Sequence, residues 1–191
     1  MSKGRLEAFS DGVLAIIITI MVLELVPPHD NDLSALSPLI PKFLSYVLSF
    51  VFLAIYWNNH HHLWQVVERV NGSILWANMH LLFWLSLIPF ATGWMGENHF
   101  STIPVALYGM VLWLSGLAYY IMVLALTKHH TKDSVLAAAV SNNTKERWSL
   151  YIYTVAILLA FVSTWIALAL YVIVAVMWLI PDRRIESKIT K

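Results

Sequence analysis

The feature that most constrains the fold is a stretch of 33 residues without a charge, from Trp148 to Ile180. As one α-helix it would be about 50 Å long, whereas the hydrocarbon core of a bilayer is about 30 Å thick. Two helices that turn near Ser163-Thr164-Trp165 fit a membrane better. Of the 191 residues, 59% are hydrophobic and 12% are charged. Soluble domains carry about a quarter charged residues, so we expect an integral membrane protein.

Apolar segments alternate with short polar connections in the rest of the chain. Pro27-Pro28 ends the first segment, and Gly96-Glu97-Asn98-His99 ends the third. The hydrophilic stretch from Lys128 to Arg147 is long enough for a short interfacial helix but too short for a domain. We therefore expect one all-α domain over residues 1–191, a polytopic membrane protein with six transmembrane helices at about 5–26, 38–59, 73–95, 102–127, 146–163 and 165–181.

The distribution of basic residues supports an even number of spans. With six spans and the N-terminus inside, eleven of the twelve Lys and Arg residues lie on the cytoplasmic side, and only Lys42 lies outside. Five spans would place the basic residues that follow Ile180 on the outside. We therefore expect both termini in the cytoplasm.

Composition and spacing give little support for an enzyme or a metal site. The chain has no cysteine, and its net charge of +1 does not indicate a nucleic-acid partner. His60-His61-His62 are consecutive, so on a helix they point about 100° apart and do not converge on one ion. We expect His60 to be buried and His80 to form a hydrogen bond between helices. No nucleophile elbow occurs, so we predict no catalytic residue, metal or cofactor.

Several tryptophans lie near the predicted ends of the spans. Trp side chains gather at both membrane–water interfaces, where the apolar ring and the polar N–H are each accommodated. We expect such an aromatic belt from Trp57, Trp64, Trp94, Trp148 and Trp178.

The first apolar segment carries charges that a simple anchor would not need. It holds Arg5, Glu7, Asp11 and Glu24, and a charge inside a membrane span costs at least a few kcal/mol. These groups must therefore face other helices or water. We interpret this helix as the wall of an internal pathway.

One face of the same helix carries a regular stripe. Positions spaced 4-3-4-3-4 along it are Arg5, Phe9, Gly12, Ile16, Thr19 and Leu23. Thr19 is the one polar side chain between Gly12 and Leu23. Two interpretations remain open: the stripe packs on a neighbouring helix with Thr19 bonded to its own helix carbonyl, or Ile16, Thr19 and Leu23 of several copies line a narrow pore.

The start of this helix, Arg5-x-x-x-Phe9-Ser10-Asp11-Gly12, resembles the Phe-Ser-Asp motif of the endosomal/lysosomal transmembrane potassium channel family, in its bacterial branch. Trp57-x-x-His60, followed by Leu63-Trp64, is similar to the family's pattern at the end of the second helix. Asn78 and Pro89-Phe90 fit its third helix. The length, the six spans and the basic tail also agree, so the resemblance covers nearly the whole chain.

This resemblance implies a potassium-preferring cation channel in the inner membrane of a bacterial cell, built as a homotetramer of six-helix subunits. The family lacks the carbonyl filter loop of ordinary potassium channels, and its first helices line the pore. Its constriction positions lie five, eight and twelve residues after the motif's Asp, which here gives Ile16, Thr19 and Leu23. The stripe derived from spacing selects the same three residues.

Such a pore has a simple physical mechanism. Rings of Ile16 and Leu23 would close it by dewetting, and a ring of Thr19 hydroxyls would replace part of the water that an ion loses. Potassium gives up its hydration more easily than sodium. Outer-mouth acidic residues, Glu24, Asp30 and Asp32, would raise the local cation concentration.

The remaining motif residues are expected to form a structural or gating network. Arg5 and Asp11 lie about 240° apart around the helix, so they do not pair directly. We expect partners on other helices, with the network drawn from Arg5, Phe9, Ser10, Asp11, Trp57, His60 and Asn78.

Two other classes of function stay open. A proton channel or proton-coupled cation transporter would use Asp11, His60 and His80 as relays, and would show a steep dependence of flux on proton concentration. A membrane enzyme or scaffold would show no ion flux in liposomes.

Overall fold

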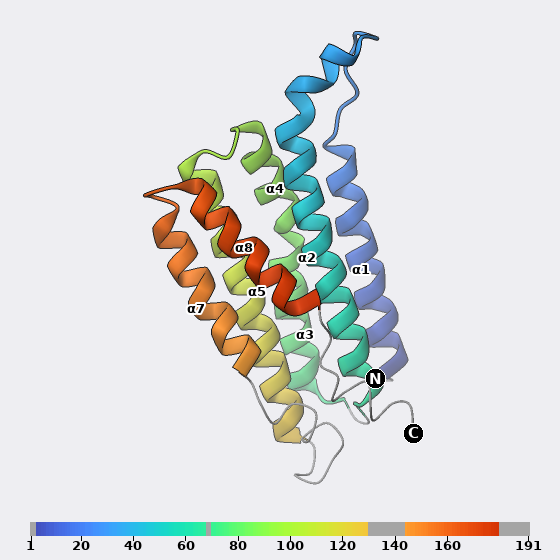
Figure 1. Ribbon diagram of the computed structural model, residues 1–191. Coiled ribbons are helices and arrows are strands. Elements are labelled where there is room, and N and C mark those ends of the chain that lie inside the picture. Colours follow the sequence, from blue (N-terminus) through green and yellow to red (C-terminus); the bar gives the residue numbers. More distant parts are fainter. Residues whose placement is uncertain (1–2, 68–69, 130–143, 180–191) are drawn as a thin grey trace.

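The computed structural model describes residues 3–67, 70–129 and 144–179, and this part of the chain is helical without strands (Figure 1). The elements are α1 (Lys3–Leu23), the 3₁₀ helix η1 (Leu33–Leu39), α2 (Ile40–Gln65), α3 (Gly72–Ser86), α4 (Ile88–Glu97), α5 (Thr102–His129), α7 (Thr144–Leu159) and α8 (Thr164–Leu179). With η1 joined to α2, and α3 and α4 counted as one broken segment, the described ranges hold six helical segments, which match the six expected. The middle of the hydrophilic stretch from Lys128 to Arg147, which is long enough for a short interfacial helix, falls on residues 130–143, outside the described ranges.

Four stretches within the described residues are long and apolar enough to cross a membrane: Lys3–Leu23, Leu33–Gln65, Gly72–Glu97 and Thr102–Lys128. The uncharged stretch at the other end of the chain forms two helices, as expected, with a turn at residues 160–163. Each of these helices, α7 and α8, has 16 residues. At 1.5 Å per residue that is about 24 Å, somewhat less than the hydrocarbon core.

The third expected span, 73–95, is broken rather than continuous. Leu87 separates α3 from α4, and Pro89 stands in the first turn of α4. Proline has no N–H to donate to the carbonyl of Leu85, and its ring crowds that carbonyl, so the helix is interrupted there. After the break, α4 approaches α2 closely at Gly96, where a Cβ would lie 2.8 Å from the Cα of Lys42.

The second span is longer than expected, because α2 continues beyond residue 59 through the histidine triplet to Gln65. His60, Leu63 and Trp64 in this extension are all buried, with 2%, 1% and 0% of their surface exposed. The polar residues from Asn58 to His62 therefore do not mark the end of this helix, because the helix continues to Gln65 and packs its buried side chains inside the bundle.

The helices form a bundle in which α1 lies at one edge and α5 lies in the middle (Figure 1). α5 packs against α3, α4, α7 and α8, whereas α1 packs against α2, α3 and α4. Between α4 and α5 the chain turns through His99 and Phe100, which have positive φ values of 49° and 57°. The edge position leaves one long face of α1 uncovered by its own chain.

The contact between α5 and α8 depends on a glycine. A Cβ on Gly109 would overlap the hydroxyl of Tyr171 and lie 2.5 Å from that ring and 3.0 Å from Ile157. Tyr171 is fully buried, and its hydroxyl donates to the carbonyl of Val105 at 3.2 Å. Burial and this hydrogen bond therefore both hold the ring in its place.

We predict that Gly109→Ala lowers the melting temperature of the detergent-purified protein. The added methyl group forces Tyr171 out of its site, and overpacking of this kind costs about 1–3 kcal/mol. Gly116→Ala on the same helix is the control, because its Cβ would meet neighbours at 3.6–3.9 Å, which is ordinary contact. Equal melting temperatures for the two variants would contradict the packing described for Tyr171.

Candidate functional site

The candidate site begins with the two faces of α1. The buried face consists of Leu6, Ser10, Leu14, Ile17 and Met21. Thr19 is two positions from both Ile17 and Met21, and two residues turn a helix by about 200°. Thr19 therefore points away from the core of its own chain, and the structure leaves it exposed.

The stripe found in the sequence lies on this exposed face. Phe9, Ile16 and Leu23 keep 48%, 59% and 76% of their surface exposed, and Arg5, Gly12 and Thr19 are exposed as well. None of the six residues is covered by another helix of the same chain within the described ranges. The polar and the apolar members of the stripe thus share one uncovered surface.

Thr19 does bond to its own helix: its Oγ1 donates to the carbonyl of Ile16 at 2.9 Å. This is the back-bond expected in the packing interpretation. The bond uses the hydroxyl proton and leaves the lone pairs of the oxygen free to accept. It therefore does not prevent the hydroxyl from facing a cation on the exposed side.

An open groove follows the side of α1. It has a volume of about 440 Å³ and is lined by Val13, Ile16, Ile17, Ile20, Glu24, Ser86, Pro89 and Phe90. Its lining comes from α1 and from the region of the α3–α4 break. The kink at Pro89 thus shapes the surface next to the stripe.

Behind α1, the structure joins three of the predicted network residues through one buried amide. Asn78 Nδ2 of α3 donates to Ser10 Oγ of α1 at 3.0 Å, and Asn78 Oδ1 lies 2.8 Å from His60 Nε2 of α2. Ser10 Oγ in turn donates to the carbonyl of Leu6 at 2.9 Å. Ser10 and Asn78 are fully buried, and His60 is 2% exposed.

Trp64 completes this network, and His60 holds its centre. Trp64 Nε1 donates to His60 Nε2 at 2.7 Å, so the same nitrogen meets the Trp64 donor and the Asn78 oxygen. A ring nitrogen carries either one proton or one lone pair. His60 Nε2 therefore satisfies one of its two neighbours at a time.

A second contact between α1 and α2 lies next to the network. Trp57 Nε1 donates to Asp11 Oδ1 at 3.0 Å. The Trp57 ring stacks on His61 with 5.7 Å between ring centroids and an angle of 15°. Asp11 thus has a partner on another helix, as predicted, whereas exposed Arg5 has no hydrogen bond or ion pair within the described ranges.

The three acidic residues at the other end of α1 are all exposed, but they do not form a cluster. Asp30 and Asp32 lie in the loop before η1, and the Glu24 carboxylate faces Gly93 of α4. Near it, Lys42 Nζ forms an ion pair with Glu97 Oε1 at 2.9 Å. The one basic residue expected on the outside is therefore paired with an acidic residue that sequence reasoning did not select.

Two aromatic assignments differ from expectation. Trp64, expected in an interfacial belt, is fully buried as a partner of His60. His80, expected to bond between helices, accepts from Trp84 Nε1 of its own helix at 2.9 Å. In both pairs Trp follows His by four residues, a spacing that places both on one helix face and could have indicated these bonds.

Within the described part of the chain, no group of three or more His, Cys, Asp or Glu side chains is placed to hold a metal ion. The candidate site consists of two features of α1. One side of the helix carries the uncovered stripe, and a buried polar network ties its other side to α2 and α3.

We predict that Asn78→Ala lowers the melting temperature and the yield of assembled protein. It removes the amide that joins Ser10 to His60. Ser10 keeps its bond to Leu6 and His60 keeps its bond from Trp64, so the loss is that of the Asn78 hydrogen bonds, each worth about 0.5–1.5 kcal/mol. Asn58→Ala is the matched control, since Asn58 has no hydrogen bond within the described ranges. Thermal unfolding and size-exclusion chromatography give the comparison, and an Asn78→Ala protein as stable as the control would remove the network from its structural role.

Comparison with known proteins identifies the family. The family model described as endosomal/lysosomal potassium channel TMEM175 matches residues 5–89, which include α1 and the network residues of α2 and α3. A protein named potassium channel from Chryseobacterium sp. (strain P1-3) is 53% identical over 189 residues, which are 99% of this chain and 98% of the relative.

One solved structure and one animal protein extend the comparison. The crystal structure of a lysosomal potassium-selective channel TMEM175 homolog from Chamaesiphon minutus has a TM-score of 0.81 at 27% identity, covering 94% of this chain and 97% of that one. The endosomal/lysosomal proton channel TMEM175 of Gallus gallus is 35% identical over 103 residues, 48% of this chain and 21% of that protein. These relatives are named as channels, not enzymes. The chain belongs to the TMEM175 family.

Proposed function

We propose that this protein is a passive, potassium-preferring cation channel that works as a homotetramer in the inner membrane of a bacterial cell. The pore would be lined by α1 of each copy, with both termini in the cytoplasm. Potassium ions would be the permeant species, other monovalent cations would pass less readily, and no cofactor would take part.

One observation carries this proposal: the face of α1 that its own chain leaves uncovered is not a surface for lipid. It holds Arg5 near one end and Thr19 in the middle, both exposed. Polar and charged groups at membrane depth face protein or water, because lipid cannot hydrogen-bond to them. Symmetry-related copies of α1 around a water-filled axis satisfy this requirement.

The groove beside the stripe supports assembly from several copies. Its lining from Val13, Ile20 and Phe90 is apolar, and Ile16 lies at its border with the stripe. A neighbouring subunit would cover this groove and leave the stripe toward the axis. Closed cyclic symmetry is the usual arrangement for identical subunits around a shared pathway.

The constriction would act through size and wetting. Ile16 and Leu23 carry large apolar side chains that are 59% and 76% exposed, so rings of them would exclude a hydrated ion and empty of water when narrow. Between them, Thr19 would offer oxygen atoms to a partly dehydrated ion. Potassium sheds water at lower cost than sodium, which favours potassium without a filter of backbone carbonyls.

The acidic residues beyond Leu23 would serve the outer mouth. Glu24, Asp30 and Asp32 are exposed, whereas Glu97 is paired with Lys42. The negative charges of Glu24, Asp30 and Asp32 would attract cations to the entrance of the pore. This attraction weakens as the salt concentration increases.

We predict that Ile16→Asn changes potassium flux in liposomes. A ring of amides stays wetted where a ring of isoleucine empties, so flux driven by a potassium gradient should rise and pass larger cations. Ile173→Asn is the matched control, because Ile173 is 53% exposed, compared with 59% for Ile16, and lies on α8. The control should conduct as wild type does.

Two results would count against this account of the pore. Equal flux for wild type and Ile16→Asn would move the constriction away from α1 while keeping the channel. Absence of potassium flux from folded, tetrameric wild-type protein would remove the channel function and favour a scaffold.

We also predict that Thr19→Ala weakens the preference for potassium over sodium without stopping conduction, because it removes the oxygen ring. Thr19→Ser keeps the hydroxyl and should retain the wild-type preference. Reversal potentials under mixed potassium and sodium gradients measure the difference. Identical reversal potentials for Thr19→Ala and Thr19→Ser would exclude the hydroxyl from selectivity.

A second candidate function is proton conduction, which the name of the Gallus gallus relative favours. The histidines do not support a relay along α1, since His60 is buried behind it and His80 is bonded within α3. Proton flux at equal potassium concentrations on both sides, measured with a pH-sensitive dye, separates the two functions.

A further inference from the structure

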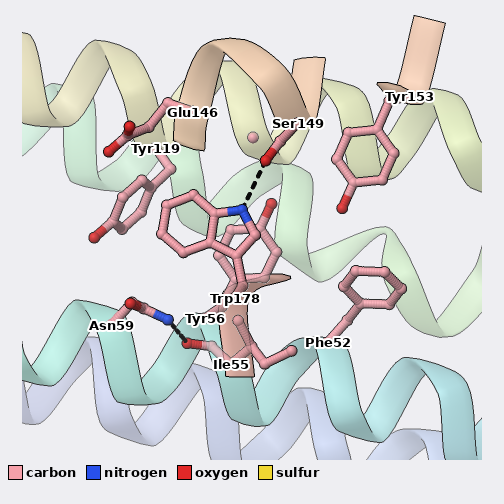
Figure 2. Close-up of a pocket in the computed structure, with 10 residues that line it drawn as sticks. Phe52, Ile55, Tyr56, Asn59, Tyr119, Glu146, Ser149, Tyr153 and Trp178 are labelled. Atoms are coloured by element: carbon pink, nitrogen blue, oxygen red, sulfur yellow. Dashed lines mark hydrogen bonds between the residues drawn. The ribbon is translucent and has the colours of Figure 1, made fainter. Parts of the chain in front are cut away.

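A second cavity lies beside α2, and none of its lining residues belongs to the network. It is enclosed by four helices, with Asn59 and Tyr56 from α2, Tyr119 from α5, Ser149 and Glu146 from α7 and Trp178 from α8 among its lining residues. Figure 2 shows the Trp178 indole between α7 and α2, in the middle of these side chains. The cavity belongs to each subunit and has no part in the α1 surface.

The lining has an unusual chemical composition for a gap between apolar helices. Five aromatic rings surround it: Phe52, Tyr56, Tyr119, Tyr153 and Trp178. Among the described residues that line it, Glu146 is the one with a charged side chain. The faces of aromatic rings are electron-rich and attract a cation, and so does a carboxylate. Neither group binds an anion favourably.

Two polar groups of the lining are already oriented by hydrogen bonds. Trp178 Nε1 donates to Ser149 Oγ at 2.7 Å, so the indole presents its ring rather than its N–H. Asn59 Nδ2 donates to the carbonyl of Ile55 at 2.8 Å, which leaves its Oδ1 as an acceptor. In Figure 2 the carboxylate of Glu146, the hydroxyl of Tyr119 and the amide oxygen of Asn59 lie on one side of the Trp178 ring.

The Trp178 ring already attracts one ammonium group. Lys145 Nζ lies 5.9 Å from its centroid, within the range of a cation–π interaction. Lys145 is not among the residues that line the cavity, so its ammonium group does not fill it. The contact shows that the Trp178 ring can bind an ammonium group.

We propose that this cavity binds a primary ammonium group. The space that the centre of a water molecule can reach in it is about 30 Å³, more than the roughly 10–15 Å³ that a single water needs. An –NH3⁺ group fits this space and brings three donors for the acceptors of Glu146, Asn59 and Tyr119. A trimethylammonium group has no N–H to donate to these acceptors, and a bare potassium ion requires more oxygen ligands than the aromatic walls supply.

Two sources carry this chemistry: a small amine in solution, or the ethanolamine headgroup of a membrane lipid. Binding of either is independent of the proposed channel function, because the cavity and the α1 stripe share no residue.

The test uses labelled methylammonium and the full-length protein in detergent, with binding measured by equilibrium dialysis. Wild type should bind one methylammonium per chain, and excess tetramethylammonium should not displace it. Gly116→Ala places a methyl group 3.8 Å from the Tyr56 hydroxyl and 3.9 Å from Tyr153, so it reduces the cavity without a clash. We expect its Kd to rise about tenfold.

Two further variants sharpen the result. Glu146→Gln removes the charge and should also raise the Kd about tenfold. Gly72→Ala makes the same chemical change as Gly116→Ala at a position with nothing within 4 Å of the new Cβ, and it should bind as wild type does. Absence of saturable methylammonium binding, or equal binding by wild type, Gly116→Ala and Glu146→Gln, would overturn the proposal.

Vesicles distinguish the two sources. In vesicles of phosphatidylcholine and phosphatidylglycerol, methylammonium should bind as in detergent. If phosphatidylethanolamine in place of phosphatidylcholine abolishes this binding, the lipid headgroup occupies the cavity. If binding persists, the cavity takes free amines.

Discussion

The buried amide of Asn78 is the interaction on which the arrangement around α1 depends. It reaches Ser10 on α1 and His60 on α2 from α3, so one side chain fixes three helices relative to one another. An unsatisfied polar group inside a membrane protein is costly, which makes this set of partners hard to exchange for another. The contact between Trp57 and Asp11 holds the same end of α1 to α2 from the outside.

Because Ser10 is held in the core, the rotation of α1 about its axis is set, and with it the set of side chains that face outward. Thr19 follows Ser10 by nine residues, and nine residues turn a helix by about 900°, which leaves the two side chains 180° apart. With Ser10 held in the core, Thr19 must face outward, with Ile16 and Leu23 beside it. The network behind the helix and the stripe in front of it are therefore one structural unit, in which the buried bonds set the orientation of the proposed pore surface.

Much of this could be predicted from the sequence, because α1 carries its information in local spacing. The stripe from Arg5 to Leu23 and the positions of the six helical segments follow from periodicity and hydrophobicity, which act over short distances. The two side-chain contacts that tie α1 to α2 and to α3 join residues 46 and 68 positions apart, and spacing alone cannot pair them. Family resemblance suggested Asn78, His60 and Trp57 as a group; their partners came from the fold.

The predictions that were wrong, for Trp64 and for the end of the second span, failed because packing in the folded chain overrides local sequence pattern. Trp64 was expected at an interface because Trp residues gather there, yet the buried His60 nitrogen holds it in the core. Residues 60–65 were left out of the second span because they are polar, although packing against α1 and α3 keeps them helical. The break at Leu87 follows from Pro89, whose effect on a helix is local and could have been included. How copies of the chain assemble lies beyond what one chain's pattern specifies.

The most direct measurement of the pore surface is the accessibility of single cysteines along α1, since the chain contains no cysteine of its own. Ile16→Cys, Thr19→Cys and Leu23→Cys would be compared with Ile17→Cys and Met21→Cys by potassium flux in liposomes before and after a cationic methanethiosulfonate. An α1-lined pore predicts that the reagent blocks the first three and leaves the last two conducting. Block at Ile17→Cys or Met21→Cys, or at none of the five, would contradict it.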